Sequence, residues 1–179
     1  ASRGSHSLQG RGFLPMRYVR PVRILGIDPG LERIGYGTVR REGSRLTAEG
    51  YGLIQTPRIE LPERLALVRR EVVELLERVR PDAVATEQLL FSVNRKTAMD
   101  VAKSLGVILC AVAEHGAPWT EFAPGAVKLS VVGNGGAEKK QVQFMVTRLL
   151  GLTETPKPDD VADALALAVC LALRSRPGA

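Results

Sequence analysis

Four acidic residues stand at places where a folded chain can bring carboxylates together. Asp28 ends an apolar, strand-like run and is followed at once by Pro-Gly, and Glu87 lies near the far end of a second apolar run. Asp160 and Asp163 are three residues apart in a helical pattern, so they point to the same helical face. If the two strands are neighbours and the helix crosses their ends, all four acids share one pocket.

Such a cluster requires cations, because two like charges about 4 Å apart repel by roughly 4 kcal/mol at an effective dielectric of about 20. The candidate ligands are all oxygens, since the histidines are His6, near the start of the chain, and His115, at a predicted helix end. Oxygen ligands favour magnesium or manganese over zinc. Two such ions can activate a water and stabilise the leaving oxygen in an attack on a phosphodiester. We therefore predict a two-metal site that compensates Asp28.

Each acid also has a purely structural interpretation. Acidic residues are common in the first turn of a helix, and Asp159 would then be the N-cap residue. Asp159 and Asp163 are four residues apart, so Asp159 can also replace Asp160 in the pocket. Asp28 can belong to an ordinary Asp-Pro-Gly turn, and Glu87 can be an ordinary acid at a strand end. The metal interpretation rests on the four acids together.

The elements that must position these acids follow from the hydrophobic pattern. Apolar runs at 23–28, 34–41 and 45–56 are separated by turn sequences and predict an antiparallel meander. Apolar residues at spacings of three and four predict a helix between Pro62 and Pro81. The next apolar run, 83–88, is then expected to be a parallel strand reached by a right-handed crossover.

The second half of the chain is also predicted to consist of helices and a strand. Its predicted elements are a helix from Ala98 that ends at Gly116, a strand at 119–124, and helices at 124–133, 137–151 and 159–176. The resulting expectation is an α/β fold in which a five-stranded mixed sheet has helices on both faces.

Composition limits the remaining possibilities. With 179 residues, of which 45% are hydrophobic, the chain is expected to form one domain over 16–179, and residues 1–15 resemble a cloning remnant or a disordered arm. The net charge of +6 favours a polyanionic partner. Without a signal peptide or an apolar run of about 18 to 20 residues, a cytoplasmic protein with no membrane partner is expected. Cys110 and Cys170 lie in apolar helical stretches and are expected to be buried, without chemistry.

Several motifs also resemble one family. GIDPG followed by GYG, PDAVATEQ, VKLSVVGNGGAEKKQV and DDVADALALA occur in the order and near the spacing of the RuvC family of bacterial Holliday junction resolvases, which have the RNase H-like fold. The resemblance extends over residues 23–172. It implies that the family's catalytic, metal-binding acids correspond to Asp28, Glu87, Asp160 and Asp163. It therefore favours Asp160 over Asp159.

The resemblance further implies a function and partners. It implies a homodimer that binds four-way junction DNA, makes symmetric nicks in two opposed strands during recombination and repair, and works with the RuvA and RuvB branch-migration proteins. Lys128 and Lys139 match family lysines near the scissile phosphate, where a lysine offsets charge in the transition state. The alternative for Lys139 and for Lys140, a further candidate DNA contact, is a solvated helix start.

One position departs from the family pattern. Many members have an aromatic residue three positions after the catalytic glutamate, where it stacks on a base, but here Leu90 occupies that position and Phe91 follows. Phe91 either takes over the stacking or belongs to the core. Arg95 and Lys96 in the same segment are candidate phosphate contacts, although exposed loop cations usually contact only water.

Two other classes of protein fit the sequence less well. A sugar-kinase-like or Hsp70-like ATPase needs two lobes, and the sequence holds no second strand-Asp-Gly copy. A scaffold that binds junction DNA without cleaving it would fit the basic charge but not the presence of all four acids.

Overall fold

A five-stranded sheet lies at the centre of the computed structural model, which describes residues 20–89 and 95–174. Its strands, in the spatial order β3-β2-β1-β4-β5, are β1 (Val22–Asp28), β2 (Arg33–Glu42), β3 (Arg45–Gln55), β4 (Ala83–Glu87) and β5 (Trp119–Phe122). The first three strands pair antiparallel, whereas β4 runs parallel to β1 and β5 runs parallel to β4. The predicted meander, parallel fourth strand and mixed sheet are all confirmed.

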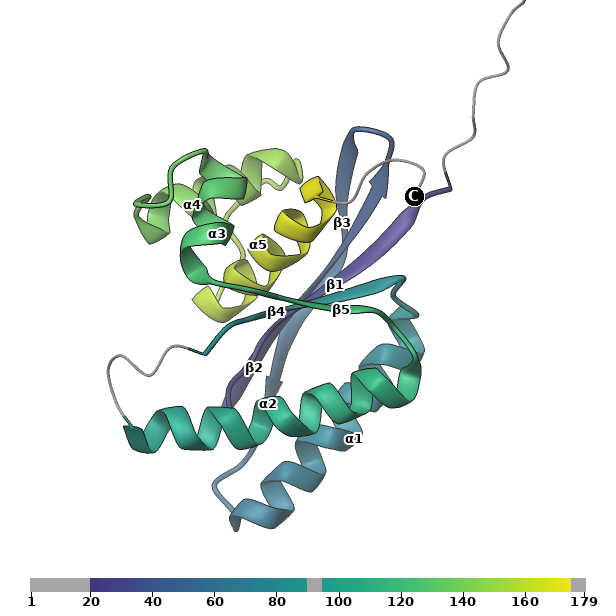
Figure 1. The fold of residues 1–179 in the computed structure, drawn as a ribbon, viewed down its shortest axis with the longest axis vertical. Coiled ribbons are helices and arrows are strands. Elements are labelled where there is room, and N and C mark those ends of the chain that lie inside the picture. The colour runs from purple at the N-terminus through teal and green to yellow at the C-terminus, as the bar shows by residue number, and fades with distance from the viewer. Residues whose placement is uncertain (1–19, 90–94, 175–179) are drawn as a thin grey trace, which may run out of the picture.

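Helices cover both faces of the sheet, as predicted (Figure 1). One face is covered by α1 (Leu61–Val79) and α2 (Arg95–His115), and the other by α3 (Pro124–Val132), α4 (Lys139–Leu149) and α5 (Asp159–Arg174). The predicted loop before the second helix ends earlier than expected, since α2 begins at Arg95. Each layer has its own apolar core, so the sheet is buried on both sides near β1.

Small residues let α5 lie unusually close to the sheet. A Cβ atom at Gly26 in β1 would be 1.9 Å from the Ala164 carbonyl oxygen, and one at Gly35 in β2 would be 2.0 Å from that of Asp160. Any larger side chain at either position would therefore push the helix away from the sheet. This close packing brings the first turns of α5 to the end of β1.

The register of the parallel strands places two acids side by side. Ile27 of β1 pairs with Thr86 of β4, so Asp28 and Glu87 are the next residues on neighbouring strands. They end the strands at the same edge of the sheet, because parallel strands have their carboxyl ends on one side. The first and fourth strands are thus neighbours, which is the condition under which Asp28 and Glu87 were expected to lie together.

The two cysteines differ in their surroundings. Cys170 is buried in α5, as expected, but Cys110 is exposed on α2, so that expectation was wrong. Hydrophobic spacing identified the helix, but Cys110 lies on its outer side rather than against α1. Within the described ranges, no helix is long and apolar enough to cross a membrane.

Candidate active site

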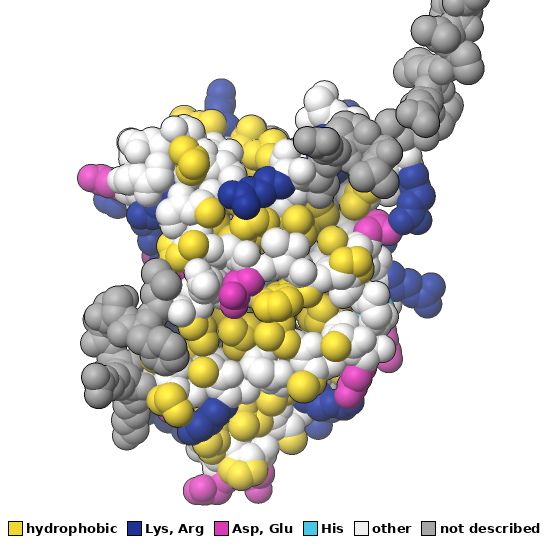
Figure 2. Space-filling model, viewed as in Figure 1, with side chains coloured by type: hydrophobic (Ala, Val, Ile, Leu, Met, Phe, Trp, Pro, Cys, Tyr) yellow, Lys and Arg dark blue, Asp and Glu magenta, His cyan; other side chains and the backbone are white. Residues whose placement is uncertain are grey.

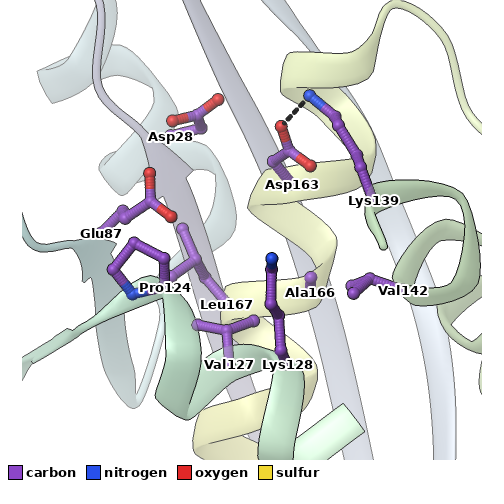
Figure 3. Close-up of a pocket in the computed structure, with 10 residues that line it drawn as sticks. All are labelled: Asp28, Glu87, Pro124, Val127, Lys128, Lys139, Val142, Asp163, Ala166 and Leu167. Atoms are coloured by element: carbon purple, nitrogen blue, oxygen red, sulfur yellow. Dashed lines mark ion pairs between the residues drawn. The ribbon is translucent and has the colours of Figure 1, made fainter. Parts of the chain in front are cut away.

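Three of the four predicted acids line one cavity. Asp28 at the end of β1, Glu87 at the end of β4 and Asp163 on α5 surround a space of about 310 Å³. Figure 3 shows their carboxylates directed toward the same space. The remaining walls are formed by two lysines and by the apolar side chains of Pro124, Val127, Val142, Ala166 and Leu167. Apolar walls around carboxylates make the charged forms costly.

Two lysines reach this cavity from different helices. Lys139, the first residue of α4, places its Nζ 2.8 Å from Asp163 Oδ2 and 3.4 Å from Asp159 Oδ2. Lys128 on α3 lines the cavity with its amine directed into it (Figure 3). Lys140 is exposed and does not line this cavity. The structure therefore distinguishes Lys139 from its neighbour, which the sequence pattern AEKK did not.

Asp160 lies in an adjoining hollow rather than in the cavity itself. That hollow is also lined by Arg33, whose Nη2 is 3.2 Å from Asp160 Oδ2. The same carboxylate oxygen is buried and accepts no hydrogen bond of good geometry, so its described partner is the Arg33 charge alone. Arg33 was missed by the sequence analysis, although a basic residue close after the Asp-Pro-Gly turn was a visible signal.

Asp159 has a different environment from the other acids of α5. It is the first residue of the helix, not the N-cap residue before it, and its side chain is 65% exposed. Gln143 Nε2 donates a hydrogen bond to its carboxylate over 3.1 Å. This bond, together with the Lys139 charge, lowers the pKa of Asp159. Asp159 is therefore a solvated, already compensated carboxylate.

The acids of the cavity hold protons more tightly than free carboxyls do. Burial raises the pKa of Asp28 to about 8, and the neighbouring carboxylates of Asp163, Glu87 and Asp160 add to the rise. Burial is also the main reason that the pKa of Glu87 is raised. The pKa of Asp163 is raised by burial too, against the opposing hydrogen bond from Lys139. Charge in the cavity is thus under-compensated, as the sequence analysis anticipated.

The donor set fits a hard divalent cation. The candidate ligands are carboxylate oxygens, which magnesium and manganese prefer, and an added positive charge would relieve the repulsion that raises the pKa of Asp28. In the described part of the chain, however, no three such side chains stand ready to hold an ion as they lie. The ion pair between Lys139 and Asp163 and that between Arg33 and Asp160 each engage one prospective ligand.

The raised pKa of Asp28 predicts a pH-dependent cost to stability. Between about pH 4 and pH 8 the folded state keeps a proton that the unfolded chain loses, so this residue's contribution to stability falls as pH rises. Asp28→Asn removes the ionisation. In EDTA, we expect the variant to melt at a higher temperature than the wild type, by a margin that widens from about pH 4 to about pH 8. A margin that is flat or shrinks over this range would contradict the pKa.

Three other predicted site residues have no described side chain. Phe91 is not among the described residues, and neither are the side chains of Arg95 and Lys96, which begin α2.

Trp119, at the start of β5, is 42% exposed and donates a hydrogen bond from Nε1 to Thr86 Oγ1 over 3.0 Å. This bond ties the edge strand to β4.

The mixed sheet, with acids at the ends of β1 and β4 and on a helix packed across them, defines a protein of the RNase H-like fold class. Residues 24–171 match the family model described as crossover junction endodeoxyribonuclease RuvC. The chain belongs to the RuvC family. It is therefore an endonuclease that resolves Holliday junctions.

Similar proteins support this assignment in sequence and in structure. A RuvC of Syntrophomonas wolfei is 51% identical over 150 residues, covering 83% of this chain and 87% of the relative. One of Thermotoga petrophila is 46% identical, covering 87% and 94%. The structure of Thermus thermophilus RuvC matches with a TM-score of 0.79 and 37% identity, covering 84% and 93%. The T. thermophilus RuvC in complex with a Holliday junction substrate matches with the same TM-score and 35% identity, covering 87% and 96%.

Proposed function

We propose that this endonuclease uses two magnesium or manganese ions, held by four acids, to hydrolyse phosphodiesters and to nick two opposed strands of a four-way junction symmetrically. The four acids are Asp28, Glu87, Asp160 and Asp163. The observation that carries the proposal is the convergence of Asp28, Glu87 and Asp163 on one cavity that two lysines also reach. Membership of the RuvC family establishes that the protein is a metal-dependent DNA nuclease. The identity and the number of the ions are part of the proposal.

The chain's own residues have distinct parts in this scheme. When bound, the ions supply an activated water and stabilise the charge on the leaving oxygen. Asp28, Glu87 and Asp163 would hold the ions from the cavity, and Asp160 would join them if its ion pair with Arg33 were released. Released from that ion pair, the Arg33 guanidinium is free to contact the DNA backbone beside the site.

Lys139 and Lys128 are assigned to the scissile phosphate. Lys139 pairs with Asp163 and Asp159 in the structure, and a phosphate oxygen entering the cavity offers it a further anionic partner. Lys128 approaches from α3, and its charge opposes the rise in the pKa of Glu87 that burial causes. Both amines can offset negative charge that develops on the phosphate in the transition state. Lys140 remains a proposed backbone contact outside the cavity.

Junction binding requires a surface larger than the cavity. The net charge of +6 supports attraction to the DNA backbone. Phe91, Arg95 and Lys96 follow Glu87 in the chain, so we assign base stacking at the crossover to Phe91 and phosphate contacts to the two cations. These assignments rest on the family pattern and the position of the segment after β4.

Partners follow from the same proposal. Two opposed strands require two active sites, which a homodimer supplies. Figure 2 shows hydrophobic side chains gathered over β5 and α2, and Trp119 and Met99 are exposed on these elements, so a second copy has apolar surface to cover. RuvA and RuvB are the proposed branch-migration partners, and the cytoplasm, where bacterial chromosomal DNA lies, is the proposed site of action.

The direct test is cleavage of a labelled, mobile four-way junction by the purified protein. With magnesium we expect paired nicks at symmetric positions in two opposed strands, and with EDTA or calcium we expect binding without nicks. A linear duplex of the same sequence should stay intact, because selectivity lies in the junction. Binding without nicks in both magnesium and manganese would overturn the proposal and favour a junction-binding scaffold.

A further inference from the structure

The turn that follows Asp28 is held by three hydrogen bonds from other parts of the fold. Ser104 Oγ on α2 donates to the Gly30 carbonyl over 2.6 Å, and Thr56 Oγ1 donates to the Leu31 carbonyl over 2.6 Å. The Thr56 backbone N–H donates to the Glu32 carbonyl over 3.1 Å. Three successive carbonyl groups of one turn therefore have fixed partners, none of which belongs to the turn.

The hydroxyl of Thr56 has its direction set by a neighbour. Arg64 on α1 donates to Thr56 Oγ1 from both Nε and Nη2, over 3.1 and 2.9 Å. Arg64 has no lone pair to accept with, so the single hydroxyl proton of Thr56 is left for the Leu31 carbonyl. Thr56 is 6% exposed and Ser104 is fully buried, so water cannot readily replace either donor.

The backbone of the turn is also tightly closed. A Cβ atom at Gly30 would lie 2.0 Å from the Arg33 carbonyl oxygen, so the chain closes tightly on itself directly after Asp28 and Pro29. Ser104 belongs to α2, the helix that follows Glu87 in the chain, and Thr56 follows β3. The Ser104 bond therefore joins the Asp28 turn to α2, and the two Thr56 bonds join it to the end of β3.

We propose that Thr56 and Ser104 are positioning residues for catalysis: by holding the turn that follows Asp28, they keep the Asp28 carboxylate in the position that metal binding requires. Carboxylate ligands must be placed within a fraction of an ångström for full activity, and hydrogen-bond partners of a ligand typically contribute 10- to 100-fold in metal affinity or activity. Ser104 and Thr56 bond the backbone two and three residues after Asp28, so we expect effects at the lower end of this range. Arg64 acts one step further away, by orienting the Thr56 hydroxyl. This inference rests on the metal site given in the proposed function.

The test compares hydroxyl removal near the turn with hydroxyl removal elsewhere. Thr56→Val removes the hydroxyl at nearly constant volume, and Thr56→Ser retains it. The matched control is Thr147→Val, because Thr147 is 8% exposed and its hydroxyl donates to the Gln143 carbonyl over 2.8 Å, within α4. For each protein we would measure the melting temperature, the Kd of Mn²⁺ by calorimetry without DNA, and kcat and KM on a junction.

We expect Thr56→Val to weaken Mn²⁺ binding and to lower kcat by about tenfold each, with KM nearly unchanged. Thr56→Ser should restore both quantities, and Thr147→Val should lower the melting temperature yet leave both near wild type. If Thr56→Val and Thr147→Val differ from the wild type only in melting temperature, the positioning role is wrong.

Ser104→Ala is the second variant, in case Thr56→Val fails to fold. It should reproduce the loss in Mn²⁺ affinity and kcat because it releases the Gly30 carbonyl, and wild-type values for both would also overturn the inference. Mn²⁺ binding by the wild type that Asp28→Asn abolishes establishes the metal site first. Absence of such binding would count against the proposed function, whereas normal binding by every hydroxyl variant would count against the positioning role alone.

Discussion

Replacing Asp28 with asparagine is expected to reduce junction nicking by roughly a thousandfold or more, the scale typical of removing a central catalytic group. Asparagine keeps the size of the side chain but removes the charge that would hold a metal ion between β1 and β4. Junction binding should remain within a few-fold of the wild type, because most of that binding energy comes from phosphate contacts elsewhere. Single-turnover cleavage and gel-shift titration on the same junction separate the two effects.

Two further aspartate variants sharpen this result. Asp160→Asn should lose nicking as Asp28→Asn does, although Asp160 pairs with Arg33 in the structure. Asp159→Asn should retain nicking within a few-fold, because Asp159 is exposed and already partnered by Gln143 and Lys139. Full nicking by Asp28→Asn would refute the catalytic assignment. Loss of nicking in Asp159→Asn together with retained nicking in Asp160→Asn would mean that Asp159, and not Asp160, belongs to the active site.

Replacing Lys139 with methionine is expected to have opposite effects on catalysis and on metal binding. Nicking should fall by roughly a hundredfold, because the variant lacks a cation that stabilises negative charge on the phosphate. Mn²⁺ binding without DNA should become roughly tenfold tighter, because the Lys139 amine no longer competes with the ion for Asp163. Calorimetry with Mn²⁺ and single-turnover cleavage measure the two quantities separately.

Lys140→Met is the matched control for this variant. The two lysines are adjacent in α4, but Lys139 lines the cavity and Lys140 does not. It should leave Mn²⁺ affinity nearly unchanged and alter junction binding only modestly. Equal changes in Mn²⁺ affinity for the two variants would mean that net charge, and not the Asp163 ion pair, controls metal binding. Unchanged nicking in Lys139→Met would remove that lysine from the catalytic step.

The fold was predictable because its signals are local and repeated. Alternation and turn sequences between 23 and 56 identify the meander, and apolar spacings of three and four identify α1 and α2. The helix before the fourth strand predicted that strand to be parallel, and Asp28 and Glu87 were expected to meet only if the first and fourth strands were neighbours. The pairing of β1 with β4 fulfils this condition, because the carboxyl ends of parallel strands meet at one edge of the sheet. Residue type was informative here, since an uncompensated carboxylate at the end of a buried strand is energetically costly.

Contacts between distant segments could not be predicted in the same way. Spacing alone put Asp160 and Asp163 on one face, but the folded chain directs Asp163 toward Lys139 and Asp160 toward Arg33. The bond from Ser104 to the turn after Asp28 joins residues 74 positions apart. Neither a periodic pattern nor a propensity carries such information, because the contacts depend on how α5 and α2 pack on opposite faces of the sheet. The chemistry of the site can therefore be predicted from its residue types, whereas its geometry depends on how the helices pack on the sheet.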